Sequence, residues 1–202
     1  MKLVAIIILS LATLLGAGTI LAAESFPLFQ SALVDKSGVI NFIQTVEGKP
    51  VPREARNGDP WIPGEKIEVS KGRGFSAKIA ISDLALISFD GGSKAKLVSG
   101  SGHEGMVPPQ IELETGVFFY KMKKGATKPL LIKAGPLKIK PSSGAGYVKF
   151  AKGRFQAICG GGSLTVTDKR KNSVGKGRGY TYKVGNKYGA VKKLPRRIIG
   201  KL

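Results

Sequence analysis

The chain has 202 residues, a formal net charge of +20, one cysteine and one histidine. A single cysteine excludes an intramolecular disulfide framework, and a single histidine excludes a metal site with two histidine ligands. The positive charge indicates an anionic partner but does not indicate the fold.

The N-terminus has the order of an export signal. Lys2 precedes an apolar run over residues 3–15, and a stretch rich in small residues follows over 16–23. This order predicts a signal peptide over residues 1–23, cleaved after Ala23 or two residues later, and hence a periplasmic or secreted protein. The apolar segment is also just long enough to span a bilayer, so an uncleaved membrane anchor stays open as an alternative.

Short segments of alternating apolar and polar residues, rich in Val, Ile and Phe, follow along the rest of the chain, with hardly any stretch of helical period. They predict strands over residues 38–46, 66–70, 76–81, 84–89, 95–98, 110–114, 116–121, 130–133, 137–140, 146–151, 154–158, 163–167 and 180–184. Glycine, at 28 of 202 residues, is about twice its usual share. It marks tight turns at residues 71–74, 90–93, 123–125 and 160–162. The sequence therefore predicts an all-β fold with short, Gly-rich strands, arranged as a sandwich, a barrel or a β-solenoid.

Several of these segments, in this order, resemble the FecR-domain family. Residues 64–79 are similar to the stretch in which a Gly-x-x-Ile segment leads into a turn and an alternating strand, and residues 90–97 resemble that family's Asp-Gly-Ser turn and following strand. The other resembling segments are 111–118, 128–132, 137–140, 144–148 and 157–166. The resemblance covers residues 38–168 and indicates a FecR-like β domain over residues 32–168.

The resemblance implies an envelope-facing, β-rich domain, which in that family is the periplasmic half of transmembrane signal regulators. Those regulators carry a cytoplasmic domain before their membrane segment, whereas only Met1 and Lys2 precede the apolar run here. We therefore expect a stand-alone exported protein without the cytoplasmic anti-sigma part.

The positive charge lies in the C-terminal part of the chain. Residues 121–202 hold 22 Lys or Arg residues and one acid, Asp168, whereas residues 24–120 hold 10 basic and 12 acidic residues. Residues 169–202 form a predicted basic C-terminal extension, with a β-ribbon expected over 176–183 and a flexible arm over 192–201. A field of this kind attracts polyanions and weakens with salt.

The predicted anion-binding residues are the basic side chains of this extension: Lys169, Arg170, Lys171, Lys176, Arg178, Lys183, Lys187, Lys192, Lys193, Arg196 and Arg197. For an exported protein, the expected partner is an anionic envelope polymer or lipid headgroups. Nucleic acid is expected only if it is extracellular. Two alternatives stay open: a merely solvated tail, and a signalling accessory that binds a protein partner through the near-neutral β half.

Signals for catalysis are weak, so we expect a non-enzymatic protein with no cofactor and no metal. His103 lies in a polar, Gly-rich loop, and residues 72–77 fit a dinucleotide fingerprint but open a strand rather than a helix. Cys159 is expected to be a small buried strand residue. Glu112 and Glu114 share one strand face, and a carbohydrate-active enzyme that uses them is the remaining alternative.

Overall fold

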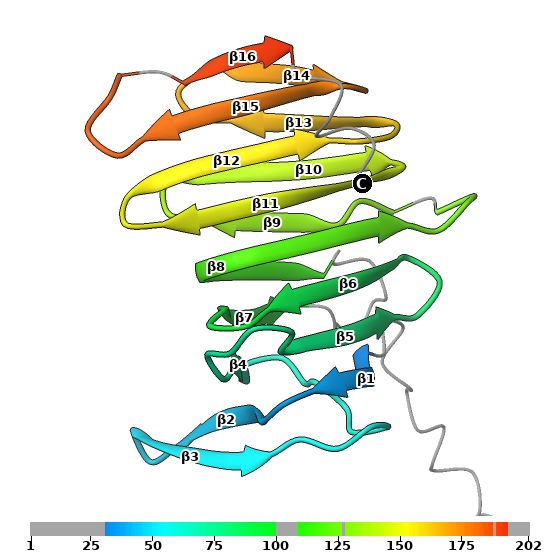
Figure 1. The fold of residues 1–202 in the computed structure, drawn as a ribbon, viewed down its shortest axis with the longest axis vertical. Coiled ribbons are helices and arrows are strands. Elements are labelled where there is room, and N and C mark those ends of the chain that lie inside the picture. Colours follow the sequence, from blue (N-terminus) through cyan, green and yellow to red (C-terminus); the bar gives the residue numbers. More distant parts are fainter. Residues whose placement is uncertain (1–30, 100–108, 127, 188, 194–202) are drawn as a thin grey trace, which may run out of the picture.

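The alternating segments of the chain fold as β-strands. A computed structural model describes residues 31–99, 109–126, 128–187 and 189–193, which form sixteen strands and no helix (Figure 1). No helix long and apolar enough to cross a membrane occurs in these residues. The all-β prediction is confirmed.

The strands form two sheets that share β8. Sheet A contains, in spatial order, β1 (Ser31–Ser37), β5 (Ser76–Ile81), β6 (Ala85–Asp90), β8 (Gln110–Met122), β11 (Ala145–Ala151), β12 (Arg154–Cys159), β15 (Arg178–Lys183) and β16 (Ala190–Lys193). Sheet B contains β3 (Lys49–Glu54), β2 (Ile40–Val46), β4 (Lys66–Val69), β7 (Lys94–Ser99), β8, β9 (Leu131–Ala134), β10 (Leu137–Ser143), β13 (Ser163–Thr167) and β14 (Lys171–Gly175). Neighbouring strands are antiparallel, except that β8 and β9 are parallel.

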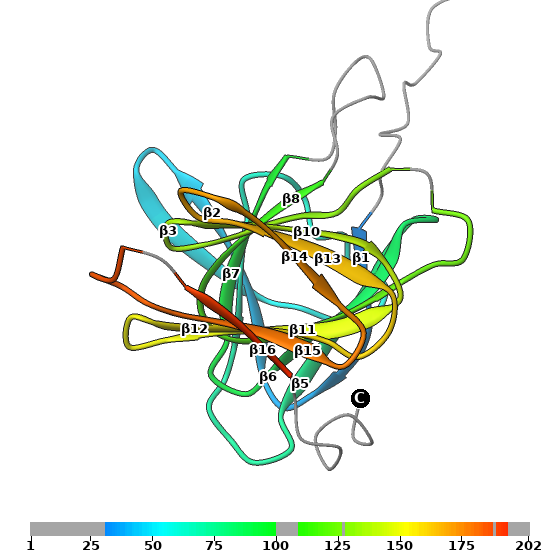
Figure 2. The ribbon, with the colours of Figure 1, turned by 90° about the horizontal axis from the view of Figure 1, so that it is seen from above.

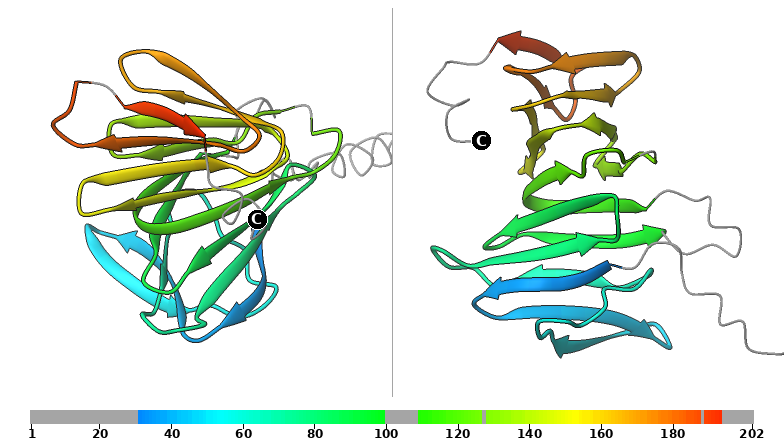
Figure 3. Two further views of the ribbon diagram at one scale, coloured as in Figure 1. Left: turned by 45° about the horizontal axis from the view of Figure 1, so that its top comes forward. Right: turned by 90° about the vertical axis from the view of Figure 1, so that its right-hand side faces the viewer.

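The sheets form an elongated sandwich. Strands stack along the long axis from β3 at one end to β16 and β14 at the other (Figure 3). Seen along this axis, β10, β13 and β14 face β11, β12, β15 and β16 (Figure 2). Alternate side chains of both sheets point inward and form one buried apolar cluster, which includes Ile79, Phe118 and Val166. Of the architectures left open by the sequence, the sandwich describes this arrangement because two sheets pack face to face.

Strand β8 forms the corner between the sheets. Its first half, Gln110 to Leu113, pairs with β7 and β9 in sheet B, whereas its second half, Gly116 to Met122, pairs with β6 and β11 in sheet A. At the bend, Gly116 has φ of +106°, and a Cβ there would lie 2.3 Å from Ser93 Oγ. The buried Ser93 hydroxyl donates to Val117 O (3.1 Å) and accepts from Val117 N (3.0 Å). The hydroxyl thus satisfies backbone groups where the strand changes sheets.

Four strands were missed by the sequence prediction, and two predicted strands are one. The segments 110–114 and 116–121 join as β8, because the glycine between them bends the strand without ending it. The missed strands are β1, β3, β14 and β16. They end the two sheets at both extremities, where a strand is half covered and need not alternate apolar residues with polar ones.

The described part of the predicted extension belongs to the sandwich. Residues 171–175 pair with β13 in sheet B, and residues 178–183 and 190–193 continue sheet A beyond β12. The ribbon expected over residues 176–183 is therefore present as β15 and its link to β14. Lys192 and Lys193, the first residues of the predicted flexible arm, belong to β16, so the arm prediction is wrong for them. The rest of the arm, residues 194–201, and the predicted signal peptide, residues 1–23, lie outside the described residues.

Candidate anion-binding site

Charge is distributed unevenly along the sandwich. The structure shows eight ion pairs among the described residues, and every acid in them precedes residue 120. Three of them join neighbouring strands, as in Lys94–Glu68 at 2.7 Å, whereas Lys66 on β4 reaches past β7 to Glu114 on β8 at 2.6 Å. The acids of that part are thus largely matched with cations. The cations that follow residue 133 have no carboxylate nearby in sequence except Asp168.

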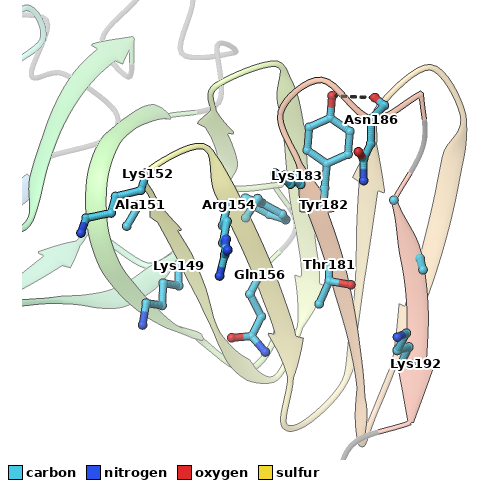
Figure 4. A pocket seen from close by; sticks show the side chains of 13 residues that line it. Lys149, Ala151, Lys152, Arg154, Gln156, Thr181, Tyr182, Lys183, Asn186 and Lys192 are labelled. Atoms are coloured by element: carbon cyan, nitrogen blue, oxygen red, sulfur yellow. Dashed lines mark hydrogen bonds between the residues drawn. The ribbon is translucent and has the colours of Figure 1, made fainter.

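A groove with a volume of about 920 Å³ lies on the C-terminal part of sheet A, across β11, β12, β15 and β16 (Figure 4). Five basic residues line this sheet A groove: Lys149, Lys152, Arg154, Lys183 and Lys192. The described residues that line it include no Asp or Glu. Gln156, Thr181 and Asn186 add polar groups, and the half-buried Tyr182 adds aromatic surface, whereas Phe155 borders the groove but is buried in the core. The groove is therefore a cationic hollow with hydrogen-bonding groups and an apolar margin.

Strand register brings the basic side chains together. Val148 and Ala157 point into the core and pair across β11 and β12, so the alternate residues Lys149, Arg154 and Gln156 point outward. The connection between β11 and β12 is a two-residue turn, Lys152-Gly153, with φ of 49° and 68°. This type of turn suits the twist of an antiparallel hairpin and places Lys152 at the rim of the groove.

Two cations face each other directly across the groove floor. Arg154 on β12 is in register with Lys183 on β15, and both side chains are exposed. Like charges directly opposite on one sheet face are destabilising by a few tenths of a kcal/mol or more. In the N-terminal half the chain neutralises such a pair, since Lys66 and Lys96 are opposite each other on β4 and β7 but Lys66 binds Glu114. Arg178 and Lys193, opposite each other on β15 and β16, are a second pair at the C-terminal end. No described acid forms an ion pair with Arg154 or Lys183, so an anion from outside the chain would find both charges available.

The far wall of the groove is held by hydrogen bonds. Tyr182 donates its hydroxyl to Asn186 O (3.2 Å), and Asn186 N donates to Lys183 O (3.0 Å), which closes the turn after β15. At the start of β16, Gly189 N donates to Asp168 Oδ2 (3.2 Å), and the buried Tyr180 donates its hydroxyl to the same oxygen. Asp168 thus connects the β13–β14 turn of sheet B to the β15–β16 wall of sheet A.

Asp168 is held ionised by these contacts. Burial alone would raise its pKa, but the hydrogen bonds from Tyr180, from Arg170 N and from Gly189 N outweigh burial and lower the pKa below its usual value. Burial, and then the bond to Asp168, raise the pKa of Tyr180. The negative charge of Asp168, the only acid after residue 120, is therefore engaged by hydrogen bonds within the protein.

The structure distributes the predicted site residues over several surfaces. Lys183 and Lys192 line the sheet A groove, whereas Lys171 lies on the outer face of sheet B. Exposed positions in turns or at the strand ends beside them hold Lys169, Arg170, Lys176, Arg178, Lys187 and Lys193. Arg196 and Arg197 lie outside the described residues.

Three groove residues were missing from the predicted site: Lys149, Lys152 and Arg154. Their signal was present in the alternation of residues 146–151 and 154–158, which places Lys149 and Arg154 opposite to the apolar face. The sequence prediction separates the basic extension from this hairpin, whereas in the structure β15 pairs with β12.

The residues considered for catalysis are engaged elsewhere. Glu112 binds Lys133 (2.9 Å) and Glu114 binds Lys66 (2.6 Å), both on the outer face of sheet B. Cys159 is fully buried, as expected; its thiol donates to Gly161 O and Gly162 O, and burial raises its pKa. No group of three or more potential metal ligands occurs in the described residues. His103 lies outside them.

Comparison with known proteins supports the fold only. No protein-family model matches the chain, and no curated protein matches its sequence. Two crystal structures of a "putative anti-sigma factor" from Parabacteroides distasonis are similar to it, with TM-scores of 0.56 and 0.55 and 14% sequence identity in each case. Each match covers 67% of this chain and 62% of the solved chain, which is less than two thirds of that protein. At this identity, the likeness concerns the backbone arrangement.

Proposed function

We propose that this chain is a non-enzymatic, envelope-facing domain of FecR-like type that binds an anionic envelope component through its basic C-terminal half. The fold of the chain is similar to that of the protein described as a "putative anti-sigma factor", in line with the sequence resemblance to the FecR-domain family. The signal order of residues 1–23 supports export to the periplasm or beyond, with an uncleaved anchor as the alternative.

The observation that carries the proposal is the sheet A groove. Five cations surround a hollow of about 920 Å³, and Arg154 and Lys183 stand opposite each other without a described acid to neutralise them. An anion between them adds two attractions that outweigh the repulsion between the cations. For an exported protein the available anions are acidic envelope polymers and lipid headgroups, and nucleic acid only outside the cell.

Deletion of residues 169–202 is not a suitable test, because it removes β14, β15 and β16 from the sheets and uncovers β12 and β13. The test is a double substitution, Lys149→Gln with Arg154→Gln, in the otherwise intact chain. The probe is fluorescently labelled long-chain inorganic polyphosphate, followed by anisotropy at several salt concentrations. A matched control, Lys49→Gln with Arg73→Gln, removes the same charges from exposed positions of the N-terminal half.

We expect the groove variant to bind polyphosphate up to roughly thirtyfold more weakly, at about 1 kcal/mol for each lost contact, and with a smaller salt dependence. The control variant should bind within about twofold of the parent. Equal weakening of both variants would mean that only net charge matters and would overturn the groove as the site.

A second function is supported by the structural likeness itself. A signalling accessory would bind a protein partner through the β domain, as the description of the similar protein suggests. The β2–β3 hairpin offers exposed Val46 and Val51 for such a contact. This function predicts envelope association that persists in high salt and in Lys149→Gln/Arg154→Gln, but is lost in Val46→Asp/Val51→Asp.

A further inference from the structure

A second hollow lies on the outer face of sheet B. It spans β9, β10, β13 and β14 and has a volume of about 720 Å³. Four lysines line this sheet B groove: Lys133, Lys138, Lys140 and Lys171. The described residues that line it include no carboxylate, and the nearest acid in register, Glu112, binds Lys133 at 2.9 Å. The other three lysines, Lys138, Lys140 and Lys171, therefore form no ion pair with a described acid.

Across β10, β13 and β14 the register alternates lysines with hydroxyl groups, whereas Lys138 is also directly opposite Lys133 on β9. Lys138 is opposite Thr167, which is opposite Lys171, and Lys140 is opposite Thr165. Ammonium and hydroxyl donors in adjacent rows form a lattice of donors on one face, which suits the repeated oxygen atoms of a phosphate chain. A lining of this composition differs from the sheet A groove, where Tyr182 forms part of the wall.

The two grooves open in opposite directions. Ile139 and Val166 of sheet B, and Ala157 and Tyr180 of sheet A, point inward and are buried between the sheets. The lysines on the opposite faces of the same strands must therefore point away from each other, and Figure 2 shows the two layers on either side of the core. A straight anionic chain in one groove leaves the other groove open.

We propose that the sheet B groove is a second anion site and that the protein is bivalent, holding two phosphate-bearing polymer chains at once, one on each face. The inference rests on the proposed function of the sheet A groove. A linear polymer is favoured over a bilayer, because both sites are concave and their cations line a hollow. The flat surface of a bilayer would contact only side chains that protrude from the protein. A bivalent monomer of this kind cross-links anionic chains without forming a dimer.

The experiment is a two-chain capture assay on the full chain. Long-chain polyphosphate is immobilised, protein is bound to it, and a second, fluorescently labelled polyphosphate is added after washing. The variants are Lys138→Gln/Lys140→Gln for the sheet B groove and Lys149→Gln/Arg154→Gln for the sheet A groove. Lys49→Gln/Arg73→Gln is the control, and the thermal unfolding midpoint of each variant and light scattering of the parent test folding and the monomeric state.

We expect each groove variant to keep binding the immobilised chain, within roughly thirtyfold of the parent, but to capture at least about fivefold less of the labelled chain. The control should capture as much as the parent. Capture by Lys138→Gln/Lys140→Gln at the parental level would overturn the second site and leave the proposed function standing.

Three other outcomes would each overturn part of these proposals. If Lys149→Gln/Arg154→Gln binds the immobilised chain as the parent does while Lys138→Gln/Lys140→Gln does not, the proposed sheet A function fails and the sheet B site stands alone. If the parent captures no second chain, or does so only as a dimer, bivalence is overturned. Binding to phosphatidylglycerol vesicles, with no binding to polyphosphate, would overturn the polymer as the ligand.

Discussion

Asp168 accepts a hydrogen bond from the hydroxyl of Tyr180 and thereby joins the two sheets at the C-terminal end of the sandwich. The same carboxylate accepts from Gly189 N, where the chain enters β16. In a region with a large excess of cations, this single acid links the two sheets. Its hydrogen bond from Gly189 N also fixes the start of β16, which forms the far wall of the sheet A groove.

Replacing Asp168 by Asn should destabilise the protein by about 1 to 3 kcal/mol at neutral pH, because charge-assisted hydrogen bonds to the carboxylate are lost. The folded-state pKa of Asp168 is lowered, so its contribution is complete above the unfolded value of about 4 and disappears as pH falls through the folded pKa. Urea unfolding at pH 7 and near pH 2.5 measures this. The difference between parent and Asp168→Asn should shrink at the acidic pH.

Tyr180→Phe serves as the comparison for that variant. It removes the hydroxyl donor but keeps the ring, which packs against Phe155 with centroids 6.2 Å apart. We expect a smaller loss at pH 7, and a weaker pH dependence of stability than in the parent. A difference between parent and Asp168→Asn that stays constant from pH 7 to 2.5 would show that the carboxylate is not ionised by these contacts.

At the corner of β8, Gly116→Ala should cost more than a substitution at an ordinary turn glycine. Alanine at φ of +106° is strained by about 1 to 2 kcal/mol, and its Cβ would also meet Ser93, so we expect a total of more than about 2 kcal/mol. The control is Gly58→Ala, since Gly58 has φ of +93° and nothing within 4 Å of its Cβ position. Thermal or urea unfolding compares them, and equal losses would remove the role assigned to the contact with Ser93.

The sequence predicts the interior of this fold better than its ends. Alternation in segments such as 76–81 and 84–89 reflects burial of one face, and β5 and β6 form there. The strand β3 contains Pro50 and Pro52, which argue against a strand interior, yet an edge strand tolerates them. The site depends on a pairing that local patterns do not contain: Arg154 meets Lys183 only because β12 pairs with β15, past the intervening β13 and β14.

The prolines of β3 should prevent self-association. The two-residue turn Glu47-Gly48 makes Val46 and Lys49 a hydrogen-bonded pair, so the positions of Pro50 and Pro52 face away from β2 and would otherwise present N–H groups at the sheet edge. We expect Pro50→Thr/Pro52→Thr to dimerise or aggregate in a concentration-dependent way, measured by light scattering. A variant that stays monomeric at concentrations where the parent does would show that the exposed charges of this edge are sufficient.

Because Arg154 and Lys183 are opposed cations, we expect a substitution that stabilises the fold here to weaken anion binding. Arg154→Glu places a carboxylate opposite Lys183, which turns a repulsive cross-strand pair into an attractive one and should stabilise the fold by about 0.5 to 1 kcal/mol at low salt. The same change puts a negative charge in the groove and should weaken polyphosphate binding by more than Arg154→Gln does. Urea unfolding and anisotropy, each at low and high salt, measure the two effects, and both should diminish as salt rises, because the side chains are exposed. A variant that loses stability and binding together would indicate that Arg154 is needed for the fold of the β11–β12 hairpin, and that its charge is not reserved for an external anion.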